Sequence, residues 1–309
     1  MAMPGNDGRS GASARRPQGR DQEPAIDLGQ TRRHPQRRGP ADERLPRPAP
    51  VVVLVHGGFL GPWIWTRTIE ELERQGLRAL TVDLPSMRGP DGDLRDDART
   101  VRDLLDGLDE VVLCGHSYAG MVITEAAAGP HRAVRHLVYL TAAIPDSGDS
   151  LAGLNEQRGD AGGEDTGGKD TGGENTGREN TGGENTGGEN TGGEEVEQLA
   201  DGRIALRRDS ALESLFHDCS PERAAQAVSL LRPENPVVGT QPVQGSAWRS
   251  LPFTYVRGDD DRLPELLSDA AAERPHEVVT LPTGHCPQWS RPDLVAGLLA
   301  RIAHAVANR

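Results

Sequence analysis

The sequence predicts an α/β fold in which a mostly parallel β-sheet carries helices on both faces. Short apolar runs of strand length alternate along the chain with stretches whose apolar residues recur at helical spacing. Such alternation is typical of a parallel sheet that is covered on both sides. The expected strands lie near residues 50–56, 77–83, 109–114, 134–141, 252–257 and 276–281, and the expected helices cover 63–75, 95–107, 118–129, 262–273 and 290–307.

Two tracts do not follow this alternation. Residues 1–48 are rich in arginine, proline and glycine, and residues 155–195 repeat the pentapeptide Gly-Gly-Glu-Asn-Thr with variations. Neither composition can bury apolar surface, so we expect a disordered tail and a disordered surface-loop insertion, where added length costs little. The pentapeptide also lacks the large apolar residue of calcium-binding β-roll repeats, so no calcium site is expected there.

The rest of the chain is long enough for one domain with a complete apolar core. We expect this core to comprise residues 49–145 and 249–309. Residues 146–248 should form a cap, which the repeat interrupts at about 155–195.

Composition narrows the class of partner. The formal net charge of -13 gives no reason to expect nucleic-acid binding. The longest apolar runs are of strand length, so neither a membrane helix nor a secretory signal is predicted. Three cysteines without metal-ligand spacing fit a reducing cytoplasm and predict neither a disulfide framework nor a metal site. We expect a cytoplasmic protein without a cofactor, and the oligomeric state stays open.

The most informative motif is Gly115-His116-Ser117-Tyr118-Ala119-Gly120, between an apolar strand and a helical pattern. A strand, a tight turn centred on a serine and an immediate helix are typical of a nucleophile elbow. The two glycines allow strand and helix to pack closely. Ser117 would be exposed on the turn, and the backbone N–H of Tyr118 at the helix N-terminus could stabilise an oxyanion.

Two later strands each end in a loop that carries a titratable residue. The first leads into Gly258-Asp259-Asp260-Asp261, and the second leads into Gly284-His285. The chain order is therefore serine, acid, histidine. In such a triad His285 takes the proton of Ser117, and a carboxylate fixes the imidazole tautomer and stabilises the imidazolium.

Several aspartates could supply that carboxylate. The G-x-x-D spacing after the strand favours Asp261. Asp259 and Asp260 are better explained as solvated loop carboxylates, but they stay open as alternatives. Asp146 is another candidate, because some hydrolases place the acid after the strand at 134–141.

Taken together, these motifs resemble the α/β-hydrolase superfamily. Within it the chain is similar to the small esterases grouped with plant methyl esterases, hydroxynitrile lyases and bacterial pyrethroid-hydrolase-like proteins. The resemblance covers about residues 49–154 and 196–307 and implies the α/β-hydrolase fold with a small helical cap. It is carried by His56-Gly57-Gly58 with Trp63 and Trp65, Val82-Asp83-Leu84-Pro85, Gly115–Gly120, Gly258–Asp261 and Gly284-His285.

The resemblance also implies roles for further residues. The backbone N–H of Gly58 would be the second oxyanion donor, beside that of Tyr118. Phe59 and Trp63 would line the substrate pocket. Apolar cap residues would form a lid over Ser117, pack the cap against the core, or do both, and we expect these to be Leu215, Phe216, Val228, Leu231 and Trp248.

The function that these observations favour is a serine carboxylesterase, which cleaves a small hydrophobic ester through an acyl-enzyme. Cys286 and Gly57 stand where the related hydroxynitrile lyases have lysine and threonine, which argues against cyanohydrin cleavage. Because fold does not fix function, other chemistry on the same scaffold stays open, namely a lactonase, thioesterase, amidase or cofactor-free oxygenase. A non-catalytic receptor for a small ligand is the remaining alternative.

Overall fold

The computed structural model describes residues 49–161, 195–274 and 276–309. The predicted disordered tail at 1–48 and most of the predicted disordered repeat lie outside the described residues. The first residues of that tract, up to Ala161, instead continue a helix that begins at Leu151.

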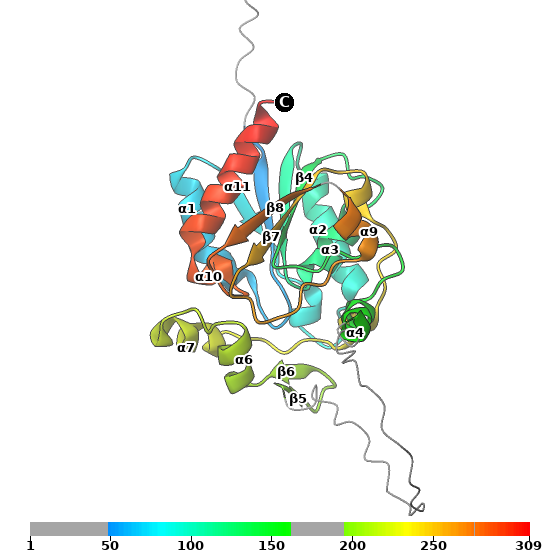
Figure 1. Cartoon of the computed structure of the whole chain (residues 1–309), viewed down its shortest axis with the longest axis vertical. Helices are drawn as coiled ribbons and strands as arrows, with labels where there is room; N and C mark the ends of the chain where they lie inside the picture. Colours follow the sequence, from blue (N-terminus) through cyan, green and yellow to red (C-terminus); the bar gives the residue numbers. More distant parts are fainter. Residues whose placement is uncertain (1–48, 162–194, 275) are drawn as a thin grey trace, which may run out of the picture. The chain divides into compact units, whose positions relative to one another are not determined.

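The centre of the fold is a six-stranded parallel sheet with the strand order β2-β1-β3-β4-β7-β8 (Figure 1). The predicted α/β fold is thereby confirmed, and each predicted strand overlaps an observed one. β3 is buried along its whole length, which explains why its sequence is apolar without alternation. The strands are β1 Val51–Val55, β2 Ala79–Thr81, β3 Val111–His116, β4 Val134–Leu140, β7 Phe253–Gly258 and β8 Glu277–Leu281.

Helices cover both faces of this sheet (Figure 1). On one face α1 and α11 pack together and bury one apolar cluster, and on the other α2 and α3 bury a second. α1 ends at Arg74, and Gly76, two residues later, has a φ of 77°, as is common for a glycine just after a helix. The helices of the core are η1 Pro62–Trp65, α1 Thr66–Arg74, η2 Pro85–Met87, α2 Leu94–Asp106, α3 Ala119–Ala126, α9 Asp269–Glu273, α10 Pro287–Ser290 and α11 Pro292–Ala307.

One predicted core helix is largely wrong. The sequence predicts a helix over 262–273, but only α9 is helical there, and residues 263–267 run as an extended loop with an isolated bridge from Leu267 to Ile144. Pro264 disfavours the α region for the residue before it. This loop turns out to line the cavity described below.

The cap is built from short elements between β4 and β7. Ser220 caps α7, because its side chain accepts a hydrogen bond from the Arg223 N–H, and Pro221 is the first helical residue. A two-stranded hairpin, β5–β6, was not predicted because its strands have only three residues each. The elements are α4 Leu151–Ala161, β5 Val196–Gln198, β6 Ile204–Leu206, α6 Arg208–Ser214, α7 Pro221–Ser229, α8 Val237–Thr240 and η3 Ala247–Arg249.

Candidate active site

Ser117 lies on a strained turn between β3 and α3. Its φ of 54° is in the left-handed region, which is uncommon for a residue other than glycine. The Ser117 N–H donates to the Leu140 carbonyl at 3.2 Å, which ties the turn to the end of β4. A Cβ on Gly120 would lie 1.9 Å from the Ala143 carbonyl oxygen, so only glycine fits there. These features match the predicted nucleophile elbow.

His285 and Asp261 lie side by side at the carboxyl ends of β8 and β7. The His285 Nδ1 is 2.9 Å from Asp261 Oδ2 and 3.1 Å from Oδ1. Both side chains are largely buried. Asp261 Oδ1 also accepts a hydrogen bond from the Leu263 N–H at 2.9 Å. A carboxylate at Nδ1 holds the proton on that nitrogen and leaves Nε2 as an acceptor.

The nitrogen Nε2 of His285 is buried and has no hydrogen-bond partner among the described residues. Ser117 and His285 line the same cavity. A buried polar atom without a partner is costly, and it commonly marks a functional position. Serine–histidine hydrogen bonds are often long before substrate binds, so this geometry is compatible with a base that serves Ser117.

The neighbouring loop carboxylates have other partners. Asp259 accepts a hydrogen bond from the Thr283 N–H at 3.1 Å, and Asp260 lies 3.3 Å from His217. Neither contacts His285 in the described part of the chain. Of the candidate acids, the structure therefore brings Asp261 to the histidine.

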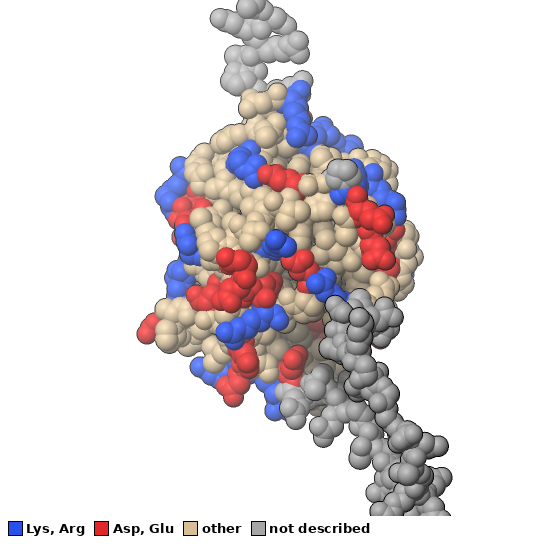
Figure 2. Space-filling view, viewed as in Figure 1, with Lys and Arg blue, Asp and Glu red and all other residues tan. Residues whose placement is uncertain are grey.

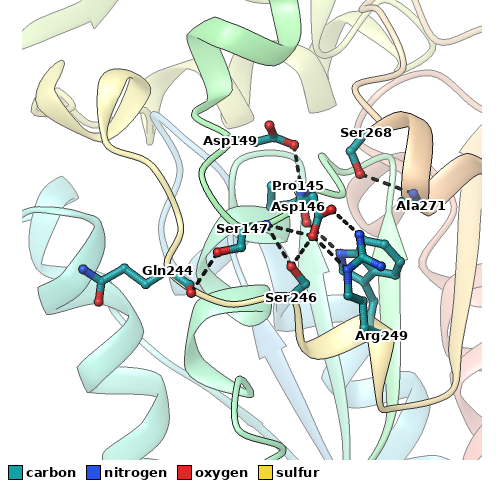
Figure 3. A network of polar contacts seen from close by, with 10 residues as sticks. Pro145, Asp146, Ser147, Asp149, Gln244, Ser246, Arg249, Ser268 and Ala271 are labelled. Atoms are coloured by element: carbon teal, nitrogen blue, oxygen red, sulfur yellow. Dashed lines mark hydrogen bonds and ion pairs between the residues drawn. The ribbon is translucent and has the colours of Figure 1, made fainter.

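Asp146, the remaining candidate, belongs to a polar network with Ser147, Ser246 and Arg249, and His285 is not among its partners in the described part of the chain (Figure 3). Its carboxylate forms a bidentate ion pair with Arg249 and accepts a hydrogen bond from Ser246. The Ser147 hydroxyl donates to the Gln244 carbonyl at 3.0 Å in the same network. Asp146 thus ties the entry of the cap to its exit and is structural, so its candidacy as the acid is not supported.

This network leads to a testable prediction about Asp146. Arg249 holds the pKa of Asp146 well below its usual range, so the network stabilises the fold at neutral pH and loses this contribution as Asp146 is protonated in acid. Asp146→Ala should lower the free energy of unfolding by about 1–2 kcal/mol at pH 7 and change kcat less than about threefold. Urea unfolding and ester turnover measure both. A loss of activity of about a thousandfold in the folded variant would instead make Asp146 the triad acid.

The two predicted oxyanion donors occupy different surroundings. Tyr118 is the residue before the first turn of α3, so its N–H points away from the helix interior. The Gly58 N–H donates no hydrogen bond within the described residues, whereas the next N–H, that of Phe59, donates to Glu234 Oε2 at 3.2 Å. Of these two N–H groups, only that of Gly58 is without a partner among the described residues. Tyr118 lines the cavity that Ser117 and His285 share, whereas Gly58 is not among its lining residues.

The cavity beside Ser117 has a volume of about 340 Å³ and is mostly apolar. Neither Phe59 nor Trp63 lines it, in contrast to the prediction. Trp63 packs edge-on against Trp289, with ring centroids 5.2 Å apart, and Phe59 lies on the turn that Glu234 holds. The walls come instead from α4, the ends of β3, β4 and β7, and the loop after Asp261, through Tyr118, Thr141–Ala143, Leu151, Ala152, Asn155, Gly239, Tyr255 and Leu263–Leu266.

The predicted apolar lid is also placed differently. Leu215 and Phe216 are buried in the cluster beneath α1 and α11, with Val228 and Leu231 packed against it, and Trp248 is buried in the opposite cluster. These residues attach the cap to the core and do not line the cavity. Their apolar character could not distinguish a lid from packing.

Several supporting residues have no signal in the sequence. The His285 carbonyl accepts hydrogen bonds from Thr141 Oγ1 at 2.8 Å and His116 Nε2 at 2.9 Å. Burial lowers the pKa of His116 well below its usual value, so this imidazole stays neutral and donates from Nε2. From the cap, the Asp218 carboxylate accepts the Gly284 N–H at 2.8 Å. The backbone of Gly284 and His285 is thus held by side chains of the core and by a side chain of the cap.

Comparisons with known proteins agree with this geometry. The model of the alpha/beta hydrolase family matches residues 52–298. The chain belongs to the α/β-hydrolase family. The alpha/beta hydrolase nvfD of Aspergillus novofumigatus is 27% identical over 274 residues, which are 82% of this hydrolase and 96% of that protein. A carbendazim hydrolyzing esterase of a Nocardioides species is 39% identical over 110 residues, which are 33% of this hydrolase and 46% of that enzyme.

A solved structure extends the similarity of the fold. The pyrethroid hydrolase of Sphingobium faniae has a TM-score of 0.62 and 23% sequence identity, and the match covers 84% of this α/β hydrolase and 99% of that chain. The expected resemblance to small esterases is confirmed, and the pyrethroid hydrolase shares the fold of this chain. The chain is an enzyme of the hydrolase class, and its relatives support esterase activity.

Surface charge, metal-ligating groups and helix hydropathy complete the description of the part of the chain that the structure describes. Figure 2 shows acidic and basic side chains interspersed over the face seen there. Within residues 49–161, 195–274 and 276–309, no group of three or more His, Cys, Asp or Glu residues is arranged to hold a metal ion. In the same ranges this α/β hydrolase has no helix with the length and hydropathy needed to span a membrane.

Proposed function

We propose that this α/β hydrolase is a serine carboxylesterase that cleaves small hydrophobic esters through an acyl-enzyme. The observation that carries the proposal is the shared cavity of Ser117 and His285, with Asp261 at 2.9 Å from the far nitrogen of the histidine. A strained serine, an unpartnered Nε2 and a carboxylate at Nδ1 are the parts that nucleophilic acyl transfer needs.

In the proposed reaction, Ser117 Oγ attacks the ester carbonyl while its proton passes to His285 Nε2. Asp261 stabilises the resulting imidazolium and keeps the ring oriented. The N–H groups of Gly58 and Tyr118 donate to the oxyanion of the tetrahedral intermediate. His285 then protonates the departing alcohol, and a water molecule, activated by the same histidine, hydrolyses the acyl-enzyme.

The cavity supports a small and largely apolar substrate. Its volume of about 340 Å³ is at the lower end for ligand pockets, and Leu151, Ala152 and Leu266 contribute apolar walls. Gly57 also bears on the choice of chemistry, because a Cβ there would lie 2.9 Å from both Ser117 Cβ and His116 Nδ1. The threonine of hydroxynitrile lyases would not fit, which favours ester hydrolysis.

A fluorophosphonate probe tests the proposal without a choice of substrate. We expect labelling of Ser117 in the purified protein, with the site mapped by mass spectrometry, and loss of labelling in His285→Ala. A folded protein that is not labelled would contradict the proposed function, and labelling that persists in His285→Ala would contradict the role of the histidine as base.

A further inference from the structure

A segment of the cap is bonded directly to the turn that carries Gly58. The Arg232 N–H donates to the Phe59 carbonyl at 2.8 Å, and the Phe59 N–H donates to the Glu234 side chain at 3.2 Å. Glu234 is itself fixed by its backbone, which exchanges two hydrogen bonds with Ile204, at 2.8 and 2.9 Å, beside the β5–β6 hairpin. Both polar backbone groups of Phe59 are therefore held by the cap.

The Glu234 carboxyl lies against Gly58. A Cβ on Gly58 would be 2.2 Å from Glu234 Oε2 and 3.3 Å from its carboxyl carbon, so the glycine is needed to admit this side chain. Only 8% of Glu234 is exposed. The triad and the oxyanion donors do not explain why an acidic residue is buried there.

We propose that Glu234 is a positioning residue for the oxyanion hole: as a neutral carboxylic acid it holds the Gly58–Phe59 turn in place, and its ionisation opposes the negative charge that develops on the substrate oxygen. The inference rests on the proposed esterase function. In this role Glu234 lets the cap contribute to transition-state stabilisation. Its ionisation sets an upper limit to the pH range in which the enzyme works.

The charged groups around Glu234 favour its neutral form. The negative charge of Asp97, on α2, acts on Glu234. The Tyr118 hydroxyl donates to Asp97 at 2.9 Å, and the charges of Asp97 and Glu234 both raise the pKa of Tyr118. Arg232, the nearby cation, is paired with Asp83 at 2.6 Å. His56 also faces Asp83, at 3.9 Å, and burial lowers its pKa to about 4, so it adds no positive charge at neutral pH.

Burial is the main cause of the shift at Glu234, and the Asp97 charge adds to it. Together they raise the pKa of Glu234 to about 8, although the hydrogen bond from Phe59 acts in the opposite direction. Glu234 is then mostly protonated at pH 7 and ionises above pH 8. A carboxylate behind the oxyanion donors would weaken their effect, because like charges repel strongly in a poorly solvated site.

The same shift affects stability in a defined pH window. In the unfolded chain Glu234 ionises near its usual value of 4.5, whereas in the folded chain it keeps its proton up to about pH 8. Between these values the folded state binds more protons, so wild-type stability falls as pH rises. Glu234→Gln cannot ionise at this position, so its stability does not decline for this reason. The Tm of Glu234→Gln minus that of wild type should therefore increase from pH 5 to pH 8.

The experiment compares Glu234→Gln, Glu234→Ala and Glu222→Gln with wild type. Glu222 is an exposed cap residue in the first turn of α7 and serves as the matched control. The probes are the rate of fluorophosphonate labelling and the turnover of 4-nitrophenyl acetate between pH 6 and 10. Thermal unfolding at pH 5 and pH 8 gives a readout that needs no turnover.

If Glu234 acts as proposed, Glu234→Gln keeps kcat within about threefold of wild type at pH 7 and loses the decline in activity above pH 8. Glu234→Ala loses the side chain that holds the turn, and its kcat should fall about tenfold or more with little change in KM. Glu222→Gln should match wild type throughout.

Some results would overturn the proposed role of Glu234, and another would overturn the proposed esterase function. An alkaline decline in Glu234→Gln equal to that of wild type, or a kcat in Glu234→Ala within about twofold of wild type, would overturn the role of Glu234 while Ser117 still labels. If the Tm difference between Glu234→Gln and wild type does not grow from pH 5 to pH 8, Glu234 is already ionised at neutral pH. This result would also overturn the proposed role of Glu234. A folded wild type that neither labels nor turns over would overturn the proposed function itself.

Discussion

Replacing Ser117 with alanine is expected to lower kcat by about three to six orders of magnitude, the largest effect of any single substitution proposed for this enzyme. In the proposed mechanism the acyl-enzyme cannot form without the Ser117 hydroxyl, and His285→Ala removes the proposed base that activates it. Because the two residues act as one unit, the double variant should be no slower than either single variant. Steady-state turnover of 4-nitrophenyl acetate, with mass spectrometry of the trapped acyl-enzyme, measures the effect.

Two aspartates in one loop provide the matched control. Asp261→Asn keeps the shape of the side chain but favours the wrong imidazole tautomer, and kcat should fall by about 10⁴-fold. Asp259→Asn, two residues away, can still accept the hydrogen bond from the Thr283 N–H and should keep kcat within about threefold. If instead Asp259→Asn is inactive and Asp261→Asn is active, the acid has been assigned to the wrong residue.

The parts of the site that could be predicted are those that depend on local sequence. Ser117 is identified by its own strand–turn–helix context, in which Gly115 is needed because a Cβ there would lie 2.6 Å from the Ala119 carbonyl oxygen. Gly120 is needed for close packing against Ala143, in the segment after β4. Asp261 and His285 follow strands whose apolar runs are clear, and the carboxyl ends of parallel strands meet at one edge of a sheet. The contact between Asp261 and His285 agrees with that reasoning.

The parts that could not be predicted depend on contacts between distant segments. The loop 263–266 contains apolar residues at spacing compatible with a helix, yet it is extended and lines the cavity. Trp63 is as apolar as any pocket residue, but it packs on Trp289 from the far end of the chain. Glu234 lies 175 residues from the Phe59 N–H that it accepts, so no local pattern reveals its burial.

Gly120→Ala should disrupt both the fold and the activity, although it adds only one methyl group. The new Cβ would lie 1.9 Å from the Ala143 carbonyl oxygen and 2.8 Å from its carbon, and both are backbone atoms. Either α3 or the segment after β4 must move, at a cost of about 1–3 kcal/mol or more in the free energy of unfolding. Such a movement also displaces Ser117, whose carbonyl accepts the Ala143 N–H at 3.3 Å.

Gly297→Ala is the matched control for this substitution. Gly297 lies inside α11 with no neighbouring atom within 4 Å of an added Cβ, so alanine should stabilise the helix by about 0.5–1 kcal/mol. In a domain of this size, 1 kcal/mol corresponds to a Tm shift of about 2–4 °C, so the two variants should shift Tm in opposite directions. Only Gly120→Ala should also slow fluorophosphonate labelling, by about a hundredfold, because a displacement of about 1 Å suffices to disturb attack. Equal Tm values for the two variants, with labelling unchanged, would mean that α3 and the segment after β4 are not packed as closely as the structure has them.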